Sequence, residues 1–208
     1  SLLASGDHKA VHKMHQMSFL IYNLVIFPII AGMLIVNDDF VRFFLGKDFQ
    51  DARYAIAIMI FRMFFIGWTN IMGIQILIPH DKNKEFMLST TIPAIVSVGL
   101  NLLFLPHFGF IGAAIVSVLT ESLVWLIQLY YTRHYLKEVP IIGAMTKIMF
   151  ASALMYGLLQ LVKPFLHFTP TLNVLVYAVL GGIIYLIAIL SLRVVDVKEL
   201  KQQFLNKQ

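Results

Sequence analysis

The sequence predicts an all-α fold, a polytopic membrane helix bundle with six transmembrane helices. The chain is 59% hydrophobic and only 13% charged, with a mean hydropathy of +0.82, whereas soluble domains carry about 25% charged residues. It contains six apolar stretches of about 20 residues or more, the length that a helix needs to cross a hydrocarbon core of about 30 Å. Short polar connectors separate these stretches. They cover Met17–Val36, Ala52–Pro79, Phe86–Pro106, Phe108–Tyr131, Ile141–Val162 and Leu172–Leu192.

Residues 1–16 are polar and are expected to be a cytoplasmic segment that leads into the first span. His8, His12 and His15 recur there at helical spacing, a pattern that could bind a metal ion. We interpret the three side chains as a solvated helix face near the lipid headgroups. No metal site and no cofactor is predicted.

Prolines and turns distinguish the predicted spans from one another. Pro28 lies near the middle of the first span, where it frees a carbonyl that a neighbouring helix or water must satisfy. The second span ends at Pro79, and the third and fourth form a tight hairpin through residues 106–109. The fifth and sixth form a plainer pair, followed by a polar tail over residues 193–208.

The distribution of Lys and Arg predicts that both termini are cytoplasmic, because cytoplasmic loops carry an excess of these residues. Only four of the sixteen fall in segments assigned to the exterior: Arg42, Lys47, Arg53 and Lys163. A topological role therefore accounts for the net charge of +5, and nucleic acid is not expected as a partner. The cytoplasmic segments hold Lys9, Lys13, Lys82, Lys84, Arg133, Lys137, Lys147, Arg193, Lys198, Lys201 and Lys207.

Two ionisable residues lie well inside the spans and at similar depths, Arg62 in the second and Glu121 in the fourth. Each costs roughly 2.5–3.5 kcal/mol at a helix centre, so both should face a bundle interior or a wet cavity. They form either a structural ion pair or a site in which Arg62 contacts an anionic headgroup and Glu121 modulates it or titrates. Arginine suits phosphate because its planar fork donates two parallel hydrogen bonds.

Uncharged polar residues accompany these two along the spans. They serve either as contacts between helices or as the lining of a pathway. Our candidate substrate-binding residues are Arg62, Asn70, Gln75 and Asn101.

The residues offer little support for catalysis, and we predict that the chain is not an enzyme. There is no cysteine, no Gly-rich phosphate loop, no nucleophile elbow and no His-Glu-x-x-His motif. A membrane-embedded glycosyl-transferase or polymerase remains an alternative. Its candidate acids and bases in exterior segments would be Asp38, Asp39, Asp48, Asp51 and His167.

The segment from Asn70 to Glu121 resembles the carboxy-terminal half of Wzx-type polysaccharide-biosynthesis flippases, in the multidrug/oligosaccharidyl-lipid/polysaccharide exporter superfamily. In that family a span ends with a Gly- and Gln-containing segment and is followed by a short lysine-bearing turn. The next span carries Asn-Leu-x-Leu-x-x-Pro, and the span after it opens with Gly-x-x-Gly-Ala-Ala and has Thr-Glu further on. The resemblance covers approximately residues 1–135. The matching residues are Gly73, Gln75, Lys82, Lys84, Asn101, Pro106, Gly109, Gly112, Ala113, Ala114, Thr120 and Glu121.

The resemblance implies that the six helices belong to the carboxy-terminal lobe of a larger transporter in a bacterial plasma membrane. Residues 17–135 would be the four-helix core of that lobe and residues 136–192 an appended pair. The chain opens with Ser-Leu-Leu-Ala-Ser-Gly-Asp, which resembles the cytoplasmic segment before the ninth helix of the family. We therefore expect the remaining amino-terminal helices of a parent protein as partners.

The function implied by the resemblance is flipping of undecaprenyl-diphosphate-linked oligosaccharide repeat units by alternating access, with the lipid bilayer and that lipid-linked substrate as partners. Coupling to a proton or sodium gradient is an expectation for the family. Alternatives within the superfamily are a lipid-linked peptidoglycan precursor flippase and a multidrug/cation antiporter.

Overall fold

The computed structural model describes residues 8–137, 139, 141–166 and 168–194, and it is helical with no strand in this part of the chain. The opening heptapeptide, which carries part of the family resemblance, and most of the predicted tail lie outside the described residues. The helices are α1 (His8–Phe44), α2 (Ala52–Met59), α3 (Arg62–Asn70), α4 (Asn83–Leu136), α5 (Ile141–Val162) and α6 (Pro170–Ser191). A π-helical segment, η2 (Ile71–Leu77), follows α3, and three short 3-10 turns are η1 (Lys47–Phe49), η3 (Ile78–His80) and η4 (Lys163–Phe165).

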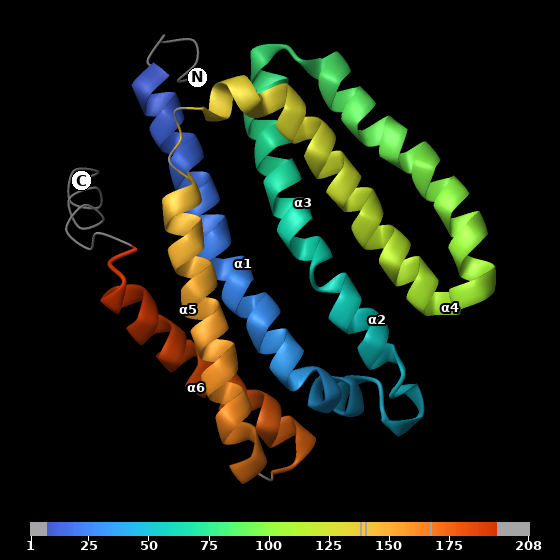
Figure 1. Ribbon diagram of the computed structural model, residues 1–208, viewed down its shortest axis with the longest axis vertical. Coiled ribbons are helices and arrows are strands. Elements are labelled where there is room, and N and C mark those ends of the chain that lie inside the picture. Colours follow the sequence, from blue (N-terminus) through green and yellow to red (C-terminus); the bar gives the residue numbers. More distant parts are fainter. Residues whose placement is uncertain (1–7, 138, 140, 167, 195–208) are drawn as a thin grey trace.

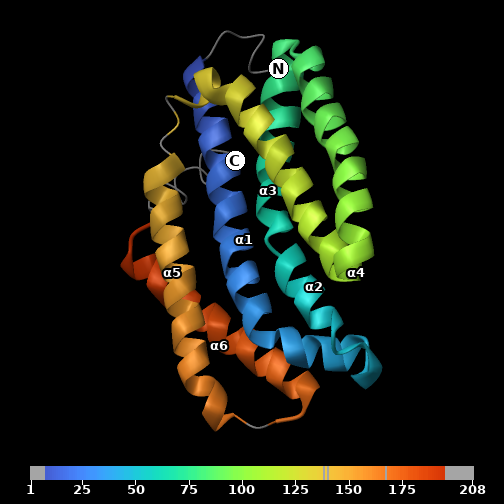
Figure 2. The ribbon, with the colours of Figure 1, turned by 45° about the vertical axis from the view of Figure 1, so that its right-hand side comes forward.

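The described residues include five helices that are long and apolar enough to cross a membrane. They confirm the prediction of a membrane helix bundle and make the chain a multi-pass membrane protein. The predicted count of six is not confirmed, because the third and fourth predicted spans lie in the single 54-residue helix α4. Figures 1 and 2 show α4 folding back on itself into two arms that run side by side.

The reversal of α4 occurs at Gly109, whose φ of 55° and ψ of −138° are not helical. A left-handed φ of this kind is accessible to glycine without a steric penalty. Gly112 then lets the arms approach closely, since a Cβ atom there would lie 2.7 Å from the carbonyl oxygen of Phe104. The predicted tight hairpin through residues 106–109 is therefore present.

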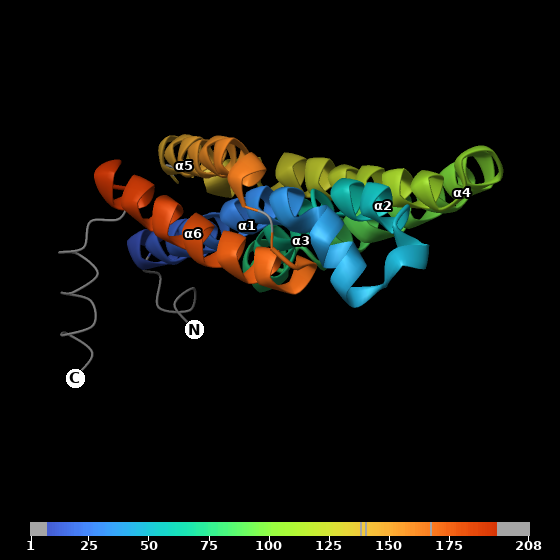
Figure 3. The ribbon, with the colours of Figure 1, turned by 90° about the horizontal axis from the view of Figure 1, so that it is seen from below.

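Helix α1 lies between two groups of helices, with α5 and α6 on one side and α2, α3 and α4 on the other (Figure 1). Seen from below, α5 and part of α4 occupy the same face of the bundle (Figure 3). The first group forms an apolar cluster with α1 whose buried members include Ile35, Ile148, Met155, Leu159 and Tyr177. The second cluster centres on Phe19, Trp68, Ile71, Met72 and Ile76.

Contacts at Pro28 match the expectation for the first span. Proline has no N–H to donate to the carbonyl four residues earlier, which here is that of Leu24. The Tyr185 hydroxyl of α6 donates a 2.8 Å hydrogen bond to that carbonyl. A neighbouring helix thus satisfies the freed group, as predicted.

Two of the predicted elements differ from the structure. The second span, predicted as one helix over Ala52–Pro79, consists of α2, α3, η2 and η3 in succession. Helix α1 begins at His8 and continues to Phe44, well beyond the predicted span Met17–Val36, because hydropathy reports burial in lipid and the flanking polar residues are still compatible with a helix.

Candidate functional site

The candidate site begins at a break in the helix that carries Arg62. Helix α2 ends at Met59 and α3 starts at Arg62. Across the break the backbone hydrogen bonds shorten to a spacing of three residues, as in Met63 N–H to Ile60 O at 3.2 Å and Phe64 N–H to Phe61 O at 3.2 Å. Broken helices within membrane spans are tolerated where protein or a cavity surrounds the irregular backbone.

Arg62 and Glu121 form an ion pair between α3 and the second arm of α4. The guanidinium Nη2 lies 2.8 Å from Glu121 Oε1, and Nε lies 3.3 Å from the same oxygen. The arginine side chain is 37% exposed and the glutamate side chain 19% exposed. Pairing lowers the cost of placing each charge among apolar helices. Both bonds end on one carboxylate oxygen, so the contact is not the parallel fork that arginine makes with both oxygens of an anion.

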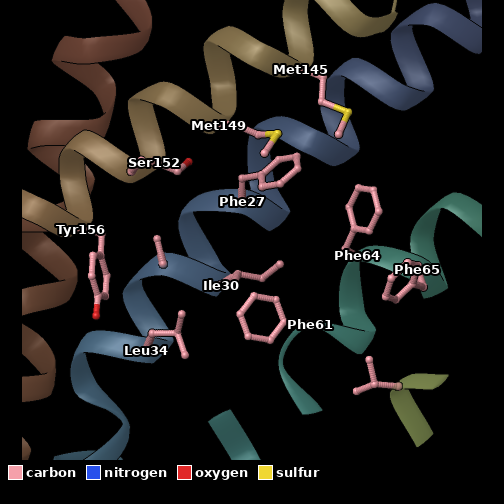
Figure 4. Close-up of a pocket in the computed structure, with 13 residues that line it drawn as sticks. Phe27, Ile30, Leu34, Phe61, Phe64, Phe65, Met145, Met149, Ser152 and Tyr156 are labelled. Carbon is pink, nitrogen blue, oxygen red and sulfur yellow. The ribbon is translucent and has the colours of Figure 1, made fainter. Parts of the chain in front are cut away.

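An apolar cavity of about 680 Å³ lies between α1, α3, α4 and α5 (Figure 4). Aromatic rings make up much of its wall, and the polar groups among its lining residues are the hydroxyls of Ser152 and Tyr156. The Ser152 Oγ is buried and has no hydrogen-bond partner among the described residues. The lining consists of Phe27, Ile30, Ala31, Leu34, Phe61, Phe64, Phe65, Val118, Met145, Met149, Ser152, Ala153 and Tyr156.

Neither member of the ion pair lines the cavity, but each is close in the chain to a residue that does. Phe61, which directly precedes Arg62, lines the cavity, and so does Val118, one helical turn before Glu121. The same helices therefore carry the ion pair and part of the apolar wall.

The other predicted site residues do not gather around Arg62. Gln75 lies in η2, where its Oε1 accepts a 2.8 Å hydrogen bond from Ser18 Oγ of α1. Asn101, in the first arm of α4, donates through Nδ2 to Ser97 O at 2.9 Å. Asn70 is exposed at the end of α3. Of the predicted residues, the structure thus brings together only Arg62 and Glu121.

The sequence analysis missed the polar residues of α1 that contact α3. Asn23 Oδ1 accepts a 3.0 Å hydrogen bond from Trp68 Nε1, and both side chains are buried. The Tyr22 hydroxyl donates to the Met63 carbonyl, and the Tyr22 ring occupies the space that a Cβ atom on Gly67 would need. An asparagine inside an apolar span was the available signal, since polar residues there need a partner.

The interpretation of the histidines as a solvated face is wrong at His15. Its side chain is only 2% exposed, and Nε2 lies 3.3 Å from the carbonyl oxygen of Gln75. Helix α1 starts early enough that His15 packs against η2 instead of facing solvent. Among the described residues, no group of three or more His, Asp or Glu side chains could hold a metal ion.

The lysine-bearing turn predicted after the second span lies between η3 and α4. Lys82 Nζ contacts Glu85 Oε1 at 3.1 Å. This hydrogen bond to Glu85 raises the pKa of Lys82. The turn therefore keeps a positive charge at this end of the bundle.

Two of the acidic residues considered for catalysis have structural partners. Asp38 Oδ1 lies 3.1 Å from Arg53 Nη1, and Asp39 Oδ2 accepts a 3.1 Å hydrogen bond from Asn173 Nδ2. Both residues lie in α1, which continues beyond the predicted span Met17–Val36. Asp48 and Asp51 are exposed near η1. His167 lies outside the described residues.

Comparison with known proteins finds similarity to a transporter over part of the chain. The chain is 30% identical over 94 residues to an Escherichia coli (strain K12) protein named Putative O-antigen transporter. The matched region covers 45% of this chain and 23% of the relative, so the chain spans about a quarter of that protein's length. No family model matches, and no solved structure matches. Similarity to a transporter favours a role that is not enzymatic.

Proposed function

We propose that this chain is part of an exporter that flips undecaprenyl-diphosphate-linked oligosaccharide repeat units across the bacterial plasma membrane by alternating access. The observation that carries the proposal is the Arg62–Glu121 ion pair on two helices that also line an apolar cavity inside a membrane helix bundle. Such a site suits an amphiphile, because its apolar wall matches a lipid chain and its arginine matches a diphosphate. The partial similarity to a protein named as an O-antigen transporter supports the same substrate class.

In this proposal the described helices form part of the carboxy-terminal lobe, and the remaining helices of the parent protein complete the path. The two arms of α4 cross the membrane separately, which gives six crossings and places both termini in the cytoplasm. Residues 17–135 form the lobe core, and residues 136–192 form the appended pair.

We assign Arg62 the role of contacting the diphosphate. Glu121 holds the guanidinium in place between substrates and modulates its charge. Asn70, Gln75 and Asn101 are assigned to substrate contact along the path, where their amides can hydrogen-bond sugar hydroxyls. Because Gln75 Oε1 already accepts from Ser18, its free amide hydrogens would make that contact.

The test compares variants of the full-length parent in cells that lack the chromosomal copy. Arg62→Ala should lower surface polysaccharide at least tenfold while the protein reaches the membrane at its normal level, as checked by immunoblot. Lipid-linked repeat units should accumulate in the inner leaflet. Normal export by Arg62→Ala would discard the headgroup role.

A charge swap separates this role from simple pairing. Arg62→Glu combined with Glu121→Arg keeps an ion pair between the same two helices but moves the cation to α4. If the pair is only structural, the swapped protein should be as stable and as active as the parent. If Arg62 contacts the anion, the protein should stay folded and export should remain low.

A further inference from the structure

Pro79 interrupts the backbone hydrogen bonding at the end of η2. Because proline has no N–H, it can donate neither to the carbonyl of Gln75, four residues earlier, nor to that of Ile74, five residues earlier. The segment is already wide, with hydrogen bonds spaced by five residues from Ile78 N–H to Gly73 O and from Lys82 N–H to Leu77 O. π-Helical turns of this kind are rare and often occur at functional sites.

His15 of α1 supplies a partner for Gln75 O, one of the two carbonyls to which Pro79 cannot donate. Its Nε2 lies 3.3 Å from Gln75 O, and since a carbonyl only accepts, the ring nitrogen must be the donor. The ring is 2% exposed, so water does not compete for this carbonyl at the contact. His80 supports the next carbonyl in the same way, with Nδ1 2.7 Å from Ile76 O.

Pro28 shows the same arrangement in another helix. The carbonyl that it frees, on Leu24, accepts a 2.8 Å hydrogen bond from Tyr185 of α6. Pro28 lies inside α1 and Pro79 in the 3-10 turn η3, and in both cases a side chain from a different helix donates to a carbonyl that the proline cannot reach. Helix α1 takes part in both contacts, once through its own carbonyl and once through its histidine.

We propose that Pro28 and Pro79 are conformational hinges, and that Tyr185 and His15 lock them by supplying the hydrogen-bond donor that each proline lacks. A helix bends most easily where a backbone hydrogen bond is absent. When the donor from the neighbouring helix withdraws, the helix can flex at that point. When the donor is present, α6 is fixed to α1 and α1 is fixed to η2. This inference does not depend on which molecule the protein transports.

Hydrogen exchange followed by mass spectrometry tests the proposal on the full chain in lipid nanodiscs at constant pH. Tyr185→Phe removes a single hydroxyl and keeps the ring. It should speed exchange in peptides covering residues 20–30 by roughly three- to tenfold, because the helix loses the stabilisation that one interhelical hydrogen bond provides. His15→Leu should do the same for residues 72–82, and His15→Gln, which keeps a donor, should have a smaller effect.

Matched controls are histidine and tyrosine residues whose bonds stay within one helix. His107 Nδ1 contacts Leu103 O, and Tyr156 accepts a hydrogen bond from Gln160. Neither His107→Leu nor Tyr156→Phe should change exchange in either peptide. Equal acceleration by a control would overturn the proposal.

The decisive step repeats the changes in proline-free backgrounds. Pro28→Ala restores an N–H for Leu24 O, so Tyr185→Phe should then leave exchange in residues 20–30 within twofold of the Pro28→Ala parent. Pro79→Ala provides an N–H that can donate to Gln75 O with α-helical spacing, and it should likewise abolish the effect of His15→Leu on residues 72–82. If either donor substitution has the same effect with and without its proline, the side chain acts through packing alone and the hinge assignment is wrong.

Discussion

The two sides of α1 differ in the regularity of the helices that they contact. Each side has an apolar cluster and also has polar contacts, but toward α5 and α6 the partner helices are continuous. Toward α3 and η2 the helices are broken or widened, and buried polar groups make specific hydrogen bonds such as Asn23 with Trp68. In a bilayer, close packing supplies stability, while polar contacts between helices add little energy but fix geometry. We therefore expect the first side to contribute mainly to stability and the second mainly to transport.

The largest effect on stability is expected on the apolar side. Leu159 is 1% exposed, so Leu159→Ala leaves a cavity and should cost about 2 kcal/mol or more of unfolding free energy. Export should stay within twofold of normal once it is scaled to the amount of folded protein. Thermal unfolding in detergent and the cellular export assay measure the two quantities. Leu161→Ala, at a side chain that is 70% exposed, is the matched control and should change neither.

An intermediate effect is expected at the glycine that lets α1 approach α3. Gly67→Ala places a methyl group where the Tyr22 ring lies, which should force the ring away from the Met63 carbonyl and cost about 1–3 kcal/mol. Export should fall further than the loss of folded protein explains, because Met63 adjoins Arg62. The same two assays apply.

Gly157→Ala in α5 is the control for this substitution, since no atom lies within 4 Å of its Cβ position. It should be neutral or stabilising by about 0.5–1 kcal/mol, as expected for alanine in a helix. A similar loss of export in both glycine variants would remove the distinction between the two sides.

The smallest effect on stability is expected at Asn23. Asn23→Leu leaves the Trp68 N–H without its acceptor, at a cost of about 1 kcal/mol in unfolding free energy. Export should nevertheless fall severalfold, because the orientation of α3 and hence of Arg62 depends on this contact. Tryptophan fluorescence reports the change around Trp68. Gln160→Leu, which breaks a bond within α5, should leave export unchanged.

Hydropathy predicted the plainest parts of the fold most accurately. The fifth predicted span and α5 both cover Ile141–Val162, and the sixth span differs from α6 by two residues at most. These helices are mostly apolar and end at polar or proline-containing turns. The bend of α4 could also be predicted, since Gly109 lies three residues after Pro106 and carries no side chain.

The broken span could not be predicted in the same way. Ile60 and Phe61, at the break before Arg62, are ordinary residues of an apolar helix, with neither proline nor glycine between them. The break therefore depends on contacts with other helices, which periodicity does not encode. The burial of His15 was missed for the same reason, because a polar residue before a span is normally taken as solvated. The similar depths of Arg62 and Glu121, by contrast, could be estimated by counting residues from the ends of their spans.

The turn at Gly109 has a practical consequence for work on this protein. One glycine reverses the chain, and the two arms of α4 touch where Gly112 lies against Phe104. The turn between the arms therefore offers no loop into which an epitope or a fluorescent protein could be inserted. Reporter fusions placed there should pull the arms apart and be degraded. The connector around η1, with its exposed Lys47, Asp48 and Phe49, offers a better point of attachment.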